Sequence, residues 1–150
     1  MRKISIKGVL LGGITDVLTT NILAIPLIIY VMAKMDWSHT PKDQLNAAIL
    51  AALHGSVLLY TVQFLIGSGC SILGGYVAAR LAKHDELLNG SLSSCLGIGI
   101  GLYSVVAGKE SRWLLLELIG LVASPALGLL GGYLRFAQKR ARGQLVSDRG

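Results

Sequence analysis

A polar run, TDVLTTN from Thr15 to Asn21, interrupts a long apolar stretch near the N-terminus. Its one carboxyl side chain is Asp16, and Thr20 follows four residues later, so helical spacing places both on the same face. A charged aspartate in the middle of a membrane helix costs about 2.5–3.5 kcal/mol on the insertion scale, which other contacts have to offset. Ionisable side chains within membrane spans usually face the bundle interior and mark ion or proton paths. The run therefore predicts a polar face that points into the protein, with Asn21 as its next member.

Two further polar residues, Gln63 and Glu117, lie in apolar surroundings. Helix rise places Asp16 about 12 Å from the inner edge of the membrane and Glu117 about 9 Å from the outer edge. In a bilayer about 30 Å thick, the two carboxyl groups would differ by roughly 9 Å in depth, which is too far to share one proton. We expect Asp16, Gln63 and Glu117 to mark a wet path. The alternative is that both carboxyl groups are structural, either protonated or hydrogen-bonded to hydroxyl and backbone groups.

The other reactive residues do not form a catalytic pattern. His39, His54 and His84 are far apart in the sequence, and neither a His-Glu-x-x-His motif nor a paired-cysteine motif occurs. The glycine-rich GIGIG at Gly97 follows no predicted strand, so it does not indicate a nucleotide loop. We therefore expect no enzyme activity, no metal and no cofactor.

Composition indicates a membrane protein. Hydrophobic residues make up 53% of the 150-residue chain and charged residues 15%, where soluble domains carry about 25% charged residues. Apolar residues cluster in four runs, each long enough to span a bilayer with about 20 residues: 8–33, 53–82, 87–108 and 113–134. The first run is longer than the apolar core of a signal peptide, so we expect it to be retained. The prediction is a single all-α domain of four transmembrane helices, with a loop at 34–52 and a basic tail at 135–150.

The distribution of basic residues predicts the orientation. Ten of the 14 lysines and arginines lie at the N-terminus, between the second and third runs, or in the tail. Cytoplasmic loops carry such an excess, so both termini should be cytoplasmic. Trp37 and Trp113 then fall near the outer ends of spans, where tryptophan favours the interface.

The sequence LGGY occurs at Leu73 and again at Leu130, each time where an even-numbered span should return to the cytoplasmic surface. Tyr76 and Tyr133 would lie in the inner aromatic belt, and Arg80 and Arg135 would reach the headgroups. The chain can thus be interpreted as two helical hairpins of the same orientation, related by a parallel repeat. The alternative is convergence on one solution for the interface.

Small residues recur at helical spacing. In the third run they alternate in steps of four and three, and this period of 3.5 residues is typical of a left-handed helix pair. Small-residue seams let membrane helices approach closely. We expect a tight bundle, and two glycines off these seams, Gly75 and Gly132, suggest contacts beyond the monomer, hence a homo-oligomer or a membrane partner. The predicted packing residues are Gly67, Gly74, Gly97, Gly101, Gly120 and Gly128.

The segment GGYVAARLAKHDELLNGSLSS, residues 74–94, resembles a pattern in small bacterial four-span membrane proteins of uncharacterised function. In that pattern Gly-Gly-Tyr-x-Ala-x-Arg-x-Ala closes one helix, and His-Gly or Asn-Gly opens the next. This chain has Asn89-Gly90 where His-Gly is frequent. The resemblance covers only this segment and implies a bacterial inner membrane, without supplying an activity.

Together these features predict a small channel or transporter component that moves an ion, a proton or a small solute. The alternative is a non-conducting accessory or scaffold protein that binds a larger membrane partner through its glycine-rich faces. The basic tail should attract anionic lipid, at about 1 kcal/mol per lysine or arginine near the surface. No aromatic or folded basic surface accompanies it, so we expect no nucleic-acid binding.

Overall fold

The computed structural model describes residues 4–35, 41, 44–106 and 114–147, and the side chains at 4–35, 41, 44–103 and 118–141. The described chain forms helices throughout, which confirms the all-α class. The helices are α1 (Ile6–Lys34), α2 (Leu45–Gly55), α3 (Val57–Ala82), α4 (Glu86–Ser93), α5 (Cys95–Val106) and α6 (Leu114–Ser147).

Three helical segments are long and apolar enough to cross a membrane: Ile6–Lys34, Val57–Ala82 and Leu118–Ala141. Most of their apolar side chains are not buried inside the protein; Val122, for example, is 78% exposed. A continuous apolar surface of this kind is unfavourable in water and suits a lipid environment. The helices therefore indicate a polytopic membrane protein.

The predicted span at 87–108 is divided between α4 and α5, which meet at Ser94. Two serine hydroxyls donate to backbone carbonyls here, one within α4 and one across to α6. Ser93 donates to the carbonyl of Gly90 at 2.7 Å, and Ser94 donates to the carbonyl of Ser124 on α6 at 2.9 Å. Such bonds compete with regular helix geometry. Neither helix alone has the length of a span, and the arrangement of four spans in two hairpins stays a prediction.

One segment differs from the sequence-based expectation. The interval 34–52, predicted as a loop, contains most of α2, because its alanine- and leucine-rich sequence favours a helix and its buried Ile49 and Leu53 cluster with Val31 of α1. The predicted tail at 135–150 continues α6 as far as Ser147. Its residues are mostly good helix formers, and Gln138 and Lys139 are bonded to α3 and α4.

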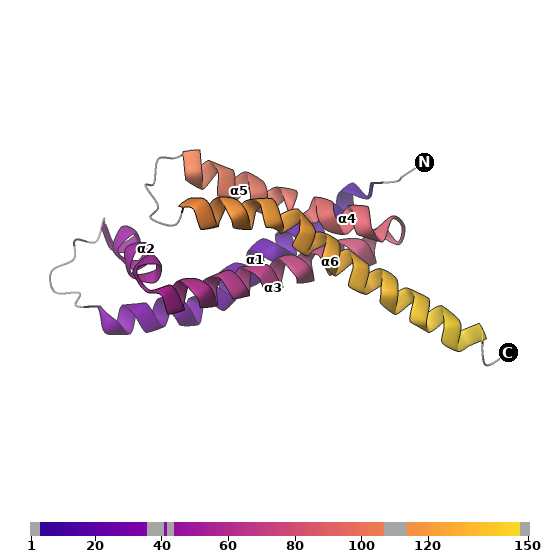
Figure 1. The fold of residues 1–150 in the computed structure, drawn as a ribbon, viewed down its shortest axis with the longest axis horizontal. Coiled ribbons are helices and arrows are strands. Elements are labelled where there is room, and N and C mark those ends of the chain that lie inside the picture. Colours follow the sequence, from indigo (N-terminus) through magenta and orange to yellow (C-terminus); the bar gives the residue numbers. More distant parts are fainter. Residues whose placement is uncertain (1–3, 36–40, 42–43, 107–113, 148–150) are drawn as a thin grey trace.

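The helices meet tightly at one end and separate toward the other (Figure 1). We call the first the closed end; it comprises the start of α1, the end of α3, α4 and the middle of α6. From it, α1 and α3 run side by side as one arm, and α5 with the first half of α6 forms the second arm. Helix α2 lies against the far end of the first arm.

Adjacent glycines form the helix contacts of the closed end. A Cβ atom placed on Gly12 of α1 would lie 2.6 Å from the carbonyl oxygen of Gly74 on α3, closer than real side chains allow. The next residue, Gly75, faces the backbone of Gly128 on α6 instead. Because successive residues point about 100° apart around a helix, one glycine pair lets α3 approach two neighbours at once.

The second LGGY sequence serves α6 in the same way. Gly131 faces the backbone of α3 at Ile72 and Tyr76, while a Cβ on Gly132 would lie 2.5 Å from the carbonyl oxygen of Glu86 on α4. Gly75 and Gly132 were expected to make contacts beyond the monomer, because they lie off the main seams. The structure instead places both in contacts within the chain.

Candidate functional site

A cavity of about 350 Å³ lies between the two arms and is lined by residues of α1, α3, α5 and α6. Its apolar walls include Val17, Phe64 and Leu121. Among the lining residues that the structure describes, Asp16 alone is ionisable. The polar lining residues are Asp16, Thr20, Asn21, Ser68, Ser71 and Ser124.

Asp16 is held at the base of this cavity. Its side chain is largely buried, with the residue 8% exposed. The hydroxyl of Ser71 on α3 donates to Oδ2 of Asp16 at 2.9 Å, and the Thr20 hydroxyl donates to Oδ1 at 3.5 Å. A Cβ on Gly74 would lie 2.8 Å from the Cβ of Asp16, so the absence of a side chain there lets α3 come close. A carboxylate accepts about four hydrogen bonds, which leaves acceptor capacity for a group in the cavity.

The structure brings together the residues of the predicted polar run. Asp16, Thr20 and Asn21 all line the cavity. The amide nitrogen of Asn21 donates to the carbonyl of Val17 at 2.7 Å, which leaves its amide oxygen as an acceptor.

The other two predicted members of the path are placed differently. Gln63 is not among the cavity-lining residues, and its amide oxygen is buried without a hydrogen-bond partner in the part of the chain that the structure describes. Glu117 lies in α6, but its side chain is not among those that the structure describes.

The glycines predicted to pack helices fall into two groups. Gly74 and Gly128 lie in backbone contacts, and Gly101 lies against the Leu121 side chain. The structure places Gly67, Gly97 and Gly120 on the cavity wall instead. A Cβ on Gly67 would meet no atom within 4 Å, and one on Gly97 would meet only Oδ2 of Asp16, at 3.9 Å.

A small-residue stripe fits both situations, because small side chains permit close approach where helices touch and leave space where they diverge. Ser71 and Ser124 line the cavity but were not predicted as site residues, because both belong to small-residue stripes that also suit helix packing. Phe64 was not predicted either. The available signal was the alternation of hydroxyls with glycines around Gly67, on the face that meets Asp16.

The predicted interface anchors lie at the closed end where the structure describes them. The Tyr76 hydroxyl donates to the amide oxygen of Gln138 at 2.7 Å, and Arg135 donates to the same oxygen at 2.9 Å. Tyr133 and Arg80 are exposed. The predicted outer anchors, Trp37 and Trp113, lie outside the described residues.

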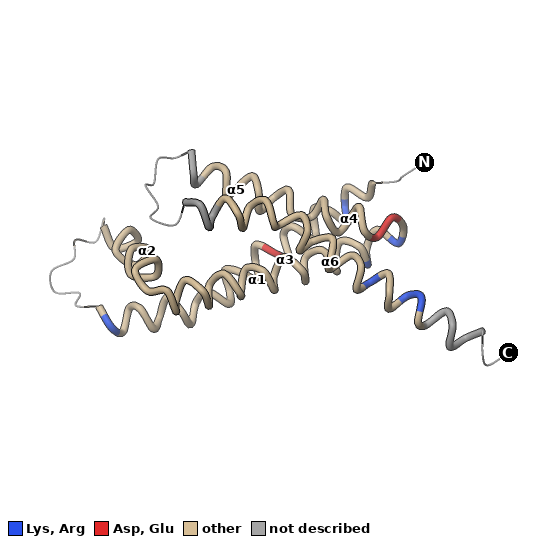
Figure 2. Tube along the Cα trace, in the orientation of Figure 1, with Lys and Arg blue, Asp and Glu red and all other residues tan. Residues whose placement is uncertain are grey.

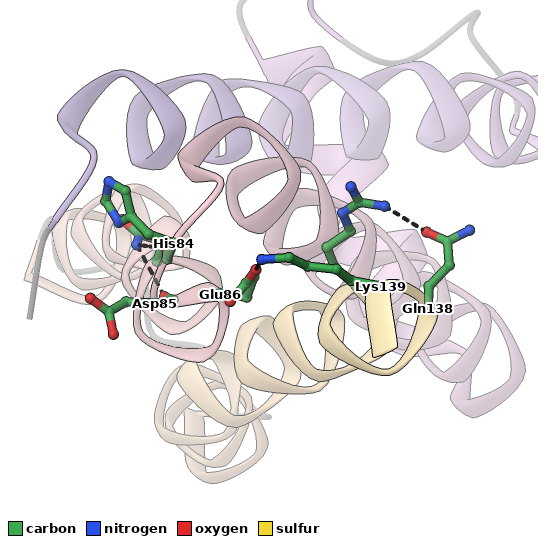
Figure 3. A network of polar contacts seen from close by, with 7 residues as sticks. His84, Asp85, Glu86, Gln138 and Lys139 are labelled. Atoms are coloured by element: carbon green, nitrogen blue, oxygen red, sulfur yellow. Dashed lines mark hydrogen bonds and ion pairs between the residues drawn. The ribbon is translucent and has the colours of Figure 1, made fainter. Parts of the chain in front are cut away.

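An ion pair joins α4 to α6 at the closed end (Figure 3). The Lys139 ammonium donates to Oε1 of Glu86 at 2.8 Å. Glu86 is buried whereas the Lys139 side chain is 58% exposed. The hydrogen bond from Lys139 lowers the pKa of Glu86, against an opposing effect of burial. The carboxylate therefore stays charged and fixes the second half of α6 against α4.

This ion pair should make the stability of the closed end depend on pH. The pKa of Glu86 is lower in the folded protein than the ordinary glutamate value of about 4.3, so the folded state binds fewer protons. The stabilisation should be complete above that ordinary value and lost as the pH falls through the lowered pKa. We expect at most about 1 kcal/mol, because Lys139 is well exposed. SDS titrations between pH 7 and pH 3 should show a steeper loss of stability for wild type than for Glu86→Gln; parallel curves would contradict this.

Comparison with known proteins does not extend this picture. No protein-family model, no curated protein and no solved structure matches the chain.

Proposed function

We propose that the chain is a four-span protein of the bacterial inner membrane, with both termini in the cytoplasm. Among the residues that the structure describes, basic side chains gather at the closed end and support this orientation (Figure 2). They are Lys7, Arg80, Lys83, Arg135, Lys139 and Arg140, whereas Lys34 ends α1 at the far end. Helices α4 and α5 together run from Glu86 to Val106, which corresponds to about 30 Å of helix and matches the thickness of a bilayer core.

We further propose that it is a channel or transporter component for an ion, a proton or a small solute. The observation that supports this most strongly is Asp16, a buried carboxyl group on a cavity whose lining includes hydroxyls of α1 and α3 and, on the opposite arm, Ser124. Glycine contacts such as that of Gly12 with Gly74 close the bundle one helical turn beyond Asp16. Close helix packing on this side of the cavity favours a transporter over an open pore.

A flux assay tests this function directly. Purified protein in liposomes should move protons or K⁺, measured with an internal pH dye under an imposed K⁺ diffusion potential. Asp16→Asn should reduce the flux at least tenfold, because removing a charge that contacts the moving ion is expected to cost more than about 1.4 kcal/mol. Glu86→Gln, which neutralises a buried carboxyl group outside the cavity, should retain it. Flux no greater than that of empty liposomes, or equal flux in Asp16→Asn, would contradict the proposal.

The accessory function remains the second candidate, because some small-residue surfaces have no neighbour among the residues that the structure describes. A Cβ on Gly69 of α3 or Gly99 of α5 would meet nothing within 4 Å. These positions suit another helix, either from a second copy or from a larger membrane protein. Absence of flux together with recovery of one stoichiometric membrane partner would favour this function. In either case the basic second half of α6 would contact anionic lipid.

A further inference from the structure

We infer that the cavity between the arms binds a small organic cation, with its ammonium group at Asp16 and its apolar part against Phe64 and Leu121. This deepens the proposed function, since it names the class of solute that the same cavity would take. The inference combines the charge of the lining, its supply of hydrogen-bond acceptors, its volume and its aromatic wall.

The charge of the lining selects a cation. Among the described lining residues Asp16 is the one ionisable group, and lysine and arginine do not occur. An unpaired carboxylate in an apolar environment is unfavourable, and the two hydroxyls bonded to it from Ser71 and Thr20 supply no positive charge. A bound cation would provide the missing counter-charge.

The cavity also offers more acceptors than its own side chains use. The Asn21 amide oxygen is left free for a ligand by the bond that its nitrogen makes to Val17. On the opposite wall, Pro125 lies inside α6 and has no N–H to donate to the carbonyl of Leu121, four residues earlier. Leu121 is itself a lining residue. An ammonium ligand would find acceptors on both arms.

The volume argues against a bare metal ion. A single water molecule needs roughly 10–15 Å³ of such space, whereas the cavity offers about 350 Å³. That value falls in the range of about 300–1,000 Å³ typical of small-molecule sites. The apolar walls would offer no hydrogen-bond partners to the water shell of a strongly hydrated ion. They would pack well against the methyl and methylene groups of an organic cation.

Phe64 supplies an aromatic part of the cavity wall. It lines the cavity from α3, and a Cβ on Gly120 of α6 would lie 3.4 Å from its ring. The phenyl ring therefore reaches the second arm at Gly120, where the absence of a side chain leaves room for it. Cations of low hydration are attracted to such a ring face, so the carboxylate and the ring together favour an alkylammonium group over Na⁺ or K⁺.

Calorimetric titration of the full chain in lipid nanodiscs tests this inference. The probes are choline and n-butylammonium, with 3,3-dimethyl-1-butanol, the neutral isostere of choline, and 1-butanol as uncharged counterparts. We expect at least one of the two cations to bind and both alcohols to bind at least tenfold more weakly. Asp16→Asn should weaken cation binding about tenfold or more, and Phe64→Leu about two- to tenfold.

Two variants outside the cavity serve as matched controls. Glu86→Gln removes a carboxylate and Phe136→Leu removes a phenyl ring, both at the closed end, and both should bind the cations as wild type does. Binding of neither cation, or equal binding of a cation and its alcohol, would overturn the inference. Equal losses in the controls would do the same. Proton or K⁺ flux without cation binding would leave the proposed function standing. Cation binding without flux of protons, of K⁺ or of the bound cation itself would refute transport and leave this inference standing.

Discussion

Replacing Gly131 with alanine should destabilise the protein by about 3 kcal/mol, the upper part of the usual range for overpacking. A Cβ at this position overlaps the carbonyl of Ile72 and would lie 2.7 Å from the backbone nitrogen of Tyr76. All of these neighbours are backbone atoms of α3, so no side chain can rotate away and the helices have to separate. The free energy of unfolding, measured by SDS titration with circular dichroism, should report the loss.

Gly69→Ala provides a control in which the expected sign is reversed. Gly69 lies within α3, and a Cβ there meets no atom within 4 Å. Alanine is a better helix former than glycine by about 1 kcal/mol, so this variant should be as stable as wild type or more stable. Destabilisation of both variants to the same degree would show that the Gly131 contact does not hold α3 and α6 together.

This contrast also explains which part of the fold was predictable. Apolar run length located α1 and α3 closely, and the end of α3 at Ala82 agrees with the predicted limit of the second span. Glycine spacing predicted that helices would pack through small residues, which is seen at Gly74 and Gly128. Spacing alone did not reveal that the same stripe opens into a cavity at Gly67, because that depends on the angle between the arms.

The remaining differences have local physical causes. At the break, the Ser94 hydroxyl bonds to the carbonyl of Ser124, thirty residues away in the sequence, and hydrophobic periodicity carries no information about such a contact. Helix α2 depends on contacts of Leu53 with the end of α1. For the candidate site, the cost of burying Asp16 was sufficient to predict a polar interior face. Its partner Ser71 comes from another helix, so only the structure identifies it.

Substitution of Asn89 is the second change from which we expect a large loss of stability. The role of Asn89 was not evident from the sequence, where it appeared only as a departure from a more frequent histidine. Its side chain is fully buried. The amide oxygen accepts from the backbone N–H of Ser5 at 2.8 Å, and the amide nitrogen donates to the carbonyls of His84 and Asp85, each at 3.0 Å. One side chain thus ties the start of α1 to the turn between α3 and α4.

That turn requires support, because Lys83 and Asp85 have positive φ angles of 60° and 44°. Non-glycine residues in this conformation cost roughly 1 kcal/mol or more each and persist where surrounding contacts hold them. Asn89→Leu should therefore lower the free energy of unfolding by at least about 2 kcal/mol, since it leaves the Ser5 N–H and the His84 carbonyl without their partner. Hydrogen exchange should become faster at the start of α1 and in the α3–α4 turn.

Asn21→Leu is the matched control for stability, because its amide is exposed and bonds only within its own helix. It should change the free energy of unfolding by less than about 0.5 kcal/mol. If Asn89→Leu behaves in the same way, the turn is held by the Glu86–Lys139 ion pair instead, and Glu86→Gln should then produce the faster exchange. Under our interpretation the order is fixed: the buried amide, with partners on two chain segments, contributes more than the exposed ion pair, because water competes for Lys139 but not for Asn89.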